Sequence, residues 1–211
     1  STPQMEGELA LTDTAFRDMR VGDGRLQFTM GESQWRWELG LDSGVRAFGT
    51  APLALDRPIE AEVVATDLDL PPYLRALRQR LPFPLMVRAD GSARLITGLS
   101  NFRDLSGRIE LAALRCQGAA TPCQLRAPGG VTVDAGSVRF DSLDLVGPGL
   151  SVTVKGKVRP GERTDLELTG HAPFPLVEPW VPAVAGIRGT PKVRVSLVGP
   201  PGKLRVDGRA E

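Results

Sequence analysis

Apolar and polar residues alternate along much of the chain, which is the pattern of strands in a sheet that buries one face. In residues 150–158 the apolar side chains Leu150, Val152, Val154 and Val158 alternate with hydroxyl and lysine side chains. This stretch predicts the clearest strand of the protein.

Shorter runs of the same alternation predict further strands, separated by glycine and proline. Trp35, Trp37 and Leu39 fall on one face of such a run, so that face must be covered. Gly22-Asp23-Gly24 and Gly129-Gly130 are predicted turns, because glycine adopts turn conformations readily. The remaining strands are expected over residues 7–11, 25–28, 34–39, 45–51, 59–70, 93–96, 107–114, 131–133, 137–145, 164–170, 192–197 and 204–208.

Charges predict the register of one hairpin. Asp165 and Glu167 lie beyond the Pro160-Gly161 turn and would face Lys155, Lys157 or Arg159 if the two strands pair. Opposite-charge pairs of this kind contribute about 0.2–1 kcal/mol each and disfavour a slip by one residue.

Helical sequence is scarce. Residues 71–81 are the best helix candidate, since proline is tolerated in a first turn and leucines recur there three and four residues apart. Residues 174–185 contain three prolines, so a helix there must be short or kinked. One or two short helices cannot cover a large sheet.

Glycines recur with a period near one hundred residues. Gly98 and Gly107 are nine residues apart, as are Gly199 and Gly208, and the sequence from Gly7 resembles that from Gly107. We therefore expect two β repeat units, residues 1–106 and 107–211, the first with a short helix near 71–81 and the second with a bent segment over 173–185. Both units begin at a similar point of the repeat, which predicts a fragment of a longer array.

The predicted fold is a mainly antiparallel sheet whose apolar face needs cover. In an open, U-shaped sheet the apolar faces line a groove, whereas in a closed β-sandwich two faces interlock about 10 Å apart. We expect the open form, with the sandwich as the alternative.

These features together resemble the repeats of the TamB and AsmA-like family: strands closed by glycine, a proline-rich bent segment, and paired glycines at a period near one hundred. The resemblance is best over residues 137–211. It implies a β-taco fold in the periplasm of a diderm bacterium, anchored to the inner membrane by sequence outside this chain. It also implies a role in outer-membrane biogenesis, through phospholipid movement or, with a TamA-like partner, through assembly of outer-membrane and autotransporter β-barrels.

The aliphatic stripe of the second unit gives this expectation a physical site. Its side chains offer apolar surface without a fixed polar partner, which suits phospholipid acyl chains, whose burial contributes about 0.8 kcal/mol per CH₂. An open groove leaves the charged head group in water. The expected lining is Leu150, Val152, Val154, Leu166, Leu168, Val193, Val195, Leu197, Leu204 and Val206.

Cys116 and Cys123 are the only cysteines. A structural disulfide at a strand end is the favoured interpretation in an oxidising periplasm, with two free thiols or a metal pair as alternatives. No histidine lies nearby, and zinc usually needs four ligands, so we expect no metal.

Other sequence features favour a binding protein over an enzyme. The sole histidine, His171, is predicted to end a strand; Asp67 and Asp69 are predicted on a solvated strand face, and Arg75, Arg78 and Arg80 on a solvated helix face. We expect no catalytic residues and no cofactor. Balanced charge, with 26 basic and 25 acidic residues, argues against a nucleic-acid partner. A competing class is a sandwich module for adhesion or carbohydrate binding.

Overall fold

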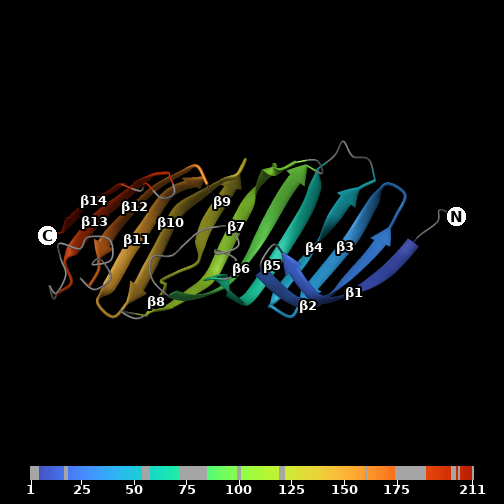
Figure 1. Ribbon diagram of the computed structural model, residues 1–211, viewed down its shortest axis with the longest axis horizontal. Coiled ribbons are helices and arrows are strands. Elements are labelled where there is room, and N and C mark those ends of the chain that lie inside the picture. The colour runs from blue at the N-terminus through green and yellow to red at the C-terminus, as the bar shows by residue number, and fades with distance from the viewer. Residues whose placement is uncertain are drawn as a thin grey trace.

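The computed structural model contains one large antiparallel sheet that runs the length of the molecule (Figure 1). It describes residues 5–16, 19–53, 58–71, 85–98, 101–118, 122–159, 161–173, 189–200, 203 and 205–210.

Fourteen strands make up this sheet. They are β1 Met5–Phe16, β2 Met19–Met30, β3 Gln34–Leu41, β4 Val45–Pro52, β5 Ile59–Asp69, β6 Leu85–Gly98, β7 Asn101–Gly118, β8 Cys123–Leu125, β9 Gly129–Asp134, β10 Ser137–Gly147, β11 Leu150–Arg159, β12 Arg163–His171, β13 Lys192–Gly199 and β14 Arg205–Ala210.

Each strand pairs with its neighbour in sequence, except around β8 and β9. These two short strands lie between β7 and β10, and both bonded neighbours run antiparallel to them. The sheet does not close into a barrel, because β1 and β14 lie at opposite ends of the hydrogen-bonded path and of the molecule (Figure 1). The predicted antiparallel β fold is confirmed.

The hairpin of β11 and β12 has the register that its charges predicted. Lys155 lies opposite Glu167, and Lys157 lies opposite Asp165. The same register places Val154 opposite Leu168 on the other face, so apolar and charged side chains are separated across the whole hairpin.

Two strands contain β-bulges of the same construction. Asp13 in β1 and Asp67 in β5 both have φ of 50°, and the register shifts beside each of them. In each bulge the backbone N–H of this aspartate donates a hydrogen bond of 2.7 Å to a carboxylate on the next strand. The acceptor is Asp23 in β2 or Asp90 in β6. A bulge twists and bends the strand that contains it.

The predicted turn at Gly22-Asp23-Gly24 is therefore wrong, because these residues lie inside β2 and form the partner of a bulge. Gly129-Gly130 likewise begin β9 rather than forming a turn, and Gly91 lies inside β6, which is longer than the strand expected over residues 93–96. Gly24, Gly91, Gly129 and Gly130 lie where a neighbouring strand, or a side chain on it, comes close, whereas Gly22 is set apart by its φ of 99°.

Gly156 and Gly170 bend β11 and β12. Their φ angles are 130° and 144°, a region that side-chain-bearing residues rarely adopt. A Cβ atom would lie 2.2 Å from the carbonyl oxygen of Asp165 at the first position and 2.0 Å from that of Ser151 at the second. Glycine kinks of this kind curve a sheet.

Helix is essentially missing from the described residues, so the expected short helices are not part of the observed architecture. Leu70 and Pro71 alone have helical conformation among them. The rest of the predicted helix over residues 71–81, including Arg75, Arg78 and Arg80, lies outside the described residues, and so does the bent segment over 174–185.

The apolar face is incompletely covered. Eleven hydrophobic residues are buried at 4–9% exposure, and no large side chain of the described residues is fully buried. All strands belong to one sheet, not to the two separate sheets of a sandwich.

The proposed division into two repeat units stays a prediction. The point at which it is drawn, between residues 106 and 107, lies within β7. Gly98 and Gly199 are the last residues of β6 and β13, and Gly107 and Gly208 lie inside the strands that follow.

Candidate functional site

The candidate site is the apolar face of the sheet. Register places nine of the ten expected lining residues on this face: Leu150, Val152 and Val154 in β11, Leu166 and Leu168 in β12, Val193, Val195 and Leu197 in β13, and Val206 in β14. Leu204 lies outside the described residues.

Many of these residues pack against one another across neighbouring strands. Val152, Ala172 and Val193 form a buried cluster, and Leu150, Val154, Leu168 and Val195 pack against it while remaining half-buried. Ala172 follows the end of β12 and was not among the expected lining residues.

The apolar face continues far beyond the expected site. From β11 to β1, the register places apolar residues of every strand on this same face. Its members include Leu145, Leu143, Val131, Ile109, Leu95, Ala93, Val63, Ala47, Leu39, Trp37, Phe28, Leu26 and Leu9.

Aromatic side chains cover glycines at the N-terminal end of this face. The ring of Phe28 lies over Gly7, where an added Cβ would be 2.2 Å from the Phe28 Cζ atom, and Trp37 lies over Gly49. Phe28 also contacts Trp35, with ring centroids 5.5 Å apart. The alternation of Trp35 and Trp37 places these two residues on one face from sequence alone. That Phe28 joins them becomes visible only from the pairing of β2 with β3.

Small residues line the middle of the apolar face. Ala47 and Gly49 in β4 pair with Val63 and Ala61 in β5, and Ala93 follows in β6. The face thus changes along its length from aromatic to small and then to branched aliphatic side chains. The small residues fill little of the space above them, so neighbouring side chains bound that space.

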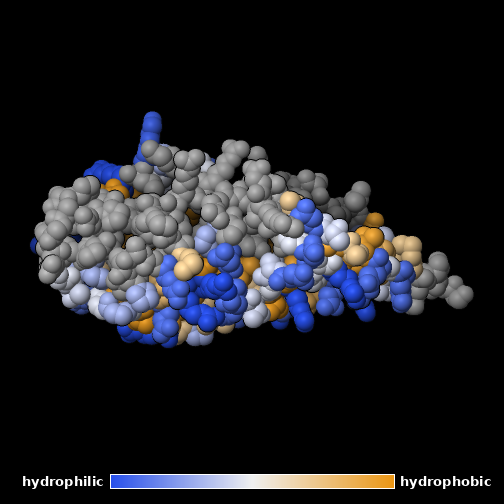
Figure 2. Space-filling model, turned by 60° about the horizontal axis from the view of Figure 1, so that its bottom comes forward, coloured by the Kyte–Doolittle hydropathy of each residue, from blue (hydrophilic) through white to orange (hydrophobic). Residues whose placement is uncertain are grey.

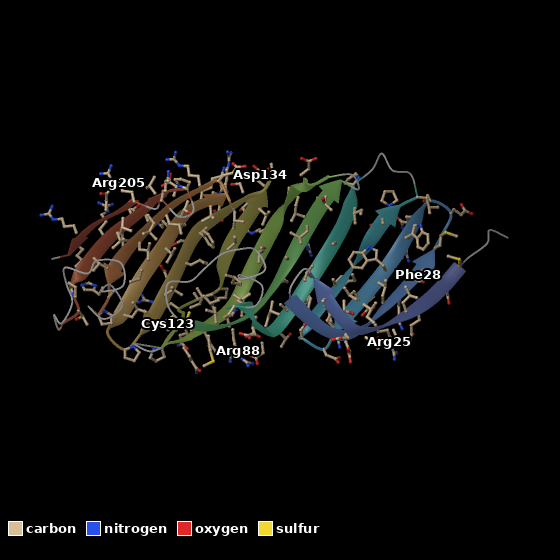
Figure 3. The ribbon with its side chains drawn as sticks, viewed as in Figure 1. Arg25, Phe28, Arg88, Cys123, Asp134 and Arg205 are labelled. Carbon is tan, nitrogen blue, oxygen red and sulfur yellow. The ribbon has the colours of Figure 1, made fainter. Side chains whose placement is uncertain are left out.

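The opposite, polar face carries ion pairs that cross between strands. Arg88 and Arg115 both pair with Asp67, and Arg115 also pairs with Asp90 at 2.8 Å. Arg88 and Cys123 lie along one long border of the sheet, and Asp134 and Arg205 along the other (Figure 3). Seen from the first border, hydrophilic residues predominate over much of the coloured surface, with hydrophobic residues visible between them along its length (Figure 2).

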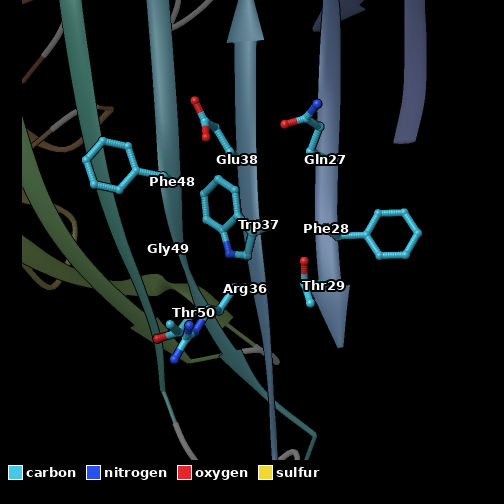
Figure 4. Close-up of a pocket in the computed structure, with 9 residues that line it drawn as sticks. All are labelled: Gln27, Phe28, Thr29, Arg36, Trp37, Glu38, Phe48, Gly49 and Thr50. Carbon is cyan, nitrogen blue, oxygen red and sulfur yellow. The ribbon is translucent and has the colours of Figure 1, made fainter. Parts of the chain in front are cut away.

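A shallow hollow of about 430 Å³ lies across β2, β3 and β4. Gln27, Glu38 and Phe48 form one row across these strands, and Thr29, Arg36 and Thr50 form the next (Figure 4). Phe48 is 40% exposed although its neighbours on this face are polar. The sequence analysis did not single out Phe48, which falls out of phase with the apolar positions of β4.

Cys116 and Cys123 face each other directly across β7 and β8. The structure contains no disulfide between them. The hydrogen bond with Cys123 and then burial raise the pKa of Cys116, whereas the hydrogen bond with Cys116 lowers the pKa of Cys123. The disulfide therefore remains a prediction. Its formation requires the two cysteines to lie opposite each other, as they do in this register.

The other singled-out polar residues are dispersed. His171 ends β12, as predicted, is exposed, and lies opposite Lys192. Asp67 is in a bulge and ion-paired with arginines, while Asp69 is exposed at the end of β5. Within the described ranges, no three or more His, Cys, Asp or Glu side chains gather in a metal-binding arrangement. Nor does any helix there have the length and hydropathy of a membrane span.

Comparison of the chain with protein-family models, with curated proteins and with solved structures finds no match. The resemblance to the TamB and AsmA-like repeats therefore rests on the sequence features described above.

Proposed function

We propose that the apolar face of this sheet binds the acyl chains of phospholipids as part of a U-shaped groove. The observation that carries the proposal is an apolar face that runs through every strand while no large side chain of the described residues is fully buried. Apolar surface left in water is costly, and contiguous patches of it commonly mark binding sites.

The chemistry of the face matches a hydrocarbon ligand. Its side chains provide dispersion contacts and no fixed hydrogen-bonding partner, so affinity would depend on chain length and not on the head group. The charged head group would remain in water at a border of the sheet, which avoids the cost of burying a charge.

Curvature supports the groove. The glycine kinks at Gly156 and Gly170 and the bulges at Asp13 and Asp67 are devices that bend a sheet out of plane. A bent sheet with one apolar face forms a trough that shields a chain on more than one side.

The resemblance to the TamB and AsmA-like family supplies the biological setting of the proposal. In that setting the chain is a non-enzymatic segment of an envelope protein in the periplasm of a diderm bacterium, anchored to the inner membrane elsewhere. Its groove carries phospholipid between the inner and outer membranes.

Lipid occupancy tests the proposal directly. We expect protein purified from bacterial membranes to retain phospholipid in native mass spectra and in organic extracts. Leu168→Asp should lower this occupancy severalfold, because it places a charge among the chains. Thr132→Asp is the control, since Thr132 faces the polar side of β9 between Arg108 and Arg139 and lies away from the cluster around Leu168. Thermal melting confirms that both variants are folded, and wild-type protein that is reproducibly free of lipid would contradict the proposal.

A second candidate is a scaffold for outer-membrane β-barrel assembly that acts by strand addition. It would use the outer edges of β1 and β14, which end the hydrogen-bonded path of the described strands. It predicts that a proline in one of these strands weakens capture of a barrel partner and leaves lipid occupancy unchanged.

A further inference from the structure

Charge is distributed unevenly along the molecule. Residues 1–52 contain five basic and eight acidic residues, whereas residues 150–211 contain ten basic and six acidic residues. The strands within these segments, β1 to β4 and β11 to β14, form opposite ends of the sheet (Figure 1). An almost neutral chain therefore has an acidic end and a basic end.

Register places several basic residues of this end at one border of the polar face, while Arg159 and Arg163 pair at the opposite border. The row nearest the border pairs His171 with Lys192, and the next row pairs Arg194 with Arg209. Arg194 and Arg209 are like charges directly opposite each other, an arrangement that destabilises a strand pair. The acidic side chains begin one row further in, with Glu167 and Asp207 on either side of Ser196.

Glu167 is the acidic partner of one residue of this border. Its carboxylate pairs with the guanidinium of Arg194 at 2.8 Å. Lys192, Arg194 and Arg209 surround a hollow of about 500 Å³, whose remaining lining is Thr169, Gly170 and Val193. The hollow therefore offers guanidinium and ammonium donors and a hydroxyl, which is a set suited to phosphate oxygens.

We propose that this border, formed by His171, Lys192, Arg194 and Arg209, docks the basic end of the sheet on the phosphate groups of an anionic lipid surface. Each Lys or Arg near such a surface contributes attraction that salt screens within a Debye length. The positive charge is on an exposed border next to the apolar face and not in an enclosed pocket, which fits an extended surface better than a small free anion.

The inference goes beyond acyl-chain binding, because it concerns the opposite face of the same strands. Docking here would place the apolar face beside a membrane from which lipid could enter or leave.

Vesicle co-sedimentation tests docking. The double variant Lys192→Glu/Arg209→Glu is compared with wild type on phosphatidylcholine vesicles, with and without about one third phosphatidylglycerol. We expect wild type to bind only the anionic vesicles, more weakly as salt rises, and the variant to bind them roughly tenfold less tightly or worse.

The matched control is Arg36→Glu/Arg46→Glu, which makes the same charge change on exposed polar-face residues at the other end. Its affinity for anionic vesicles should stay within about threefold of wild type. Lys192→Arg/Arg209→Lys should bind like wild type. Equal losses in both reversed pairs, no binding of wild type to anionic vesicles, or displacement by millimolar inorganic phosphate at constant ionic strength would each overturn the proposal. Acyl-chain occupancy, measured with neutral lipid, reads out the proposed function separately.

Discussion

Gly156 and Gly170 show how single residues set the shape of this sheet. Both lie on the apolar face, directly opposite Leu166 and Val152, and both have positive φ. A side chain at either position would meet the backbone of the neighbouring strand at 2.2 Å or less. The backbone there cannot move away without breaking the ladder, so these bends require glycine.

Gly156→Ala should lower the free energy of unfolding by about 2–4 kcal/mol, from backbone strain and the clash with Asp165. Gly40→Ala is the matched control, because no atom lies within 4 Å of an added Cβ atom there, and its effect should be within about 0.5 kcal/mol. Urea denaturation measures both. Similar losses in the two variants would show that position 156 is not a bend that needs glycine.

The cysteine pair makes a prediction about redox state. Protein from an oxidising compartment should contain the Cys116–Cys123 disulfide, and its removal by Cys116→Ala/Cys123→Ala should cost about 2–3 kcal/mol for so short a loop. After reduction, Cys123 should be alkylated before Cys116, because the pKa of Cys123 is lowered and that of Cys116 is raised. Peptide mapping by mass spectrometry reads both results, and faster labelling of Cys116 would contradict the assignment.

At the level of elements, the two bulges are the least expected feature. Each depends on a Thr-Asp pair in one strand and an Asp-Gly pair in the next: Thr12-Asp13 with Asp23-Gly24, and Thr66-Asp67 with Asp90-Gly91. The second bulge is reinforced by Arg88 and Arg115. Because the same two dipeptides occur at both bulges, we infer that these residues specify the bulge.

Asp90→Ala should lower the free energy of unfolding by about 1–3 kcal/mol, since it removes a charged acceptor from the Asp67 N–H and from Arg115. Asp69→Ala, at an exposed strand end close by, is the control and should change stability by less than about 0.5 kcal/mol. Thermal or urea unfolding distinguishes them. An effect of Asp90→Ala no larger than that of Asp69→Ala would contradict the role given to the bulge.

Sequence reasoning recovered the strands whose alternation is local and missed what depends on neighbours. The register of β11 and β12 followed from Lys155, Lys157 and their acidic partners. The interior of β2 was misinterpreted as a turn at Gly22-Asp23-Gly24, because a glycine such as Gly24 that makes room for another strand looks in sequence like one that turns the chain. Which strand approaches a glycine is a non-local fact.

The candidate site was predicted in part for the same reason. Alternation alone identified the aliphatic stripes of β11 to β13, since each is visible within one strand. Continuity of that face through Ala47 and Ala93 to Phe28 could not be predicted. Small residues carry little hydrophobic signal, and only the full strand order joins them into one surface.

At the scale of the whole molecule, the sheet has two faces of different chemistry. The apolar face runs from β1 to β14 and is proposed to hold acyl chains, while the polar face carries cross-strand ion pairs and a basic end. Residues adjacent in sequence alternate between the faces, so the two proposed functions can be separated one residue at a time.

Site-specific photocrosslinking in bacterial membranes uses that alternation and tests the central claim most directly. A photoreactive residue is placed on the apolar face at Leu26, Val154 or Val195, and on the polar face at the adjacent Gln27, Thr153 or Ser196. We predict that phospholipid is captured at the three apolar positions and not at their polar neighbours. Equal capture from both faces, or none from the apolar face of folded protein, would contradict acyl-chain binding by this sheet.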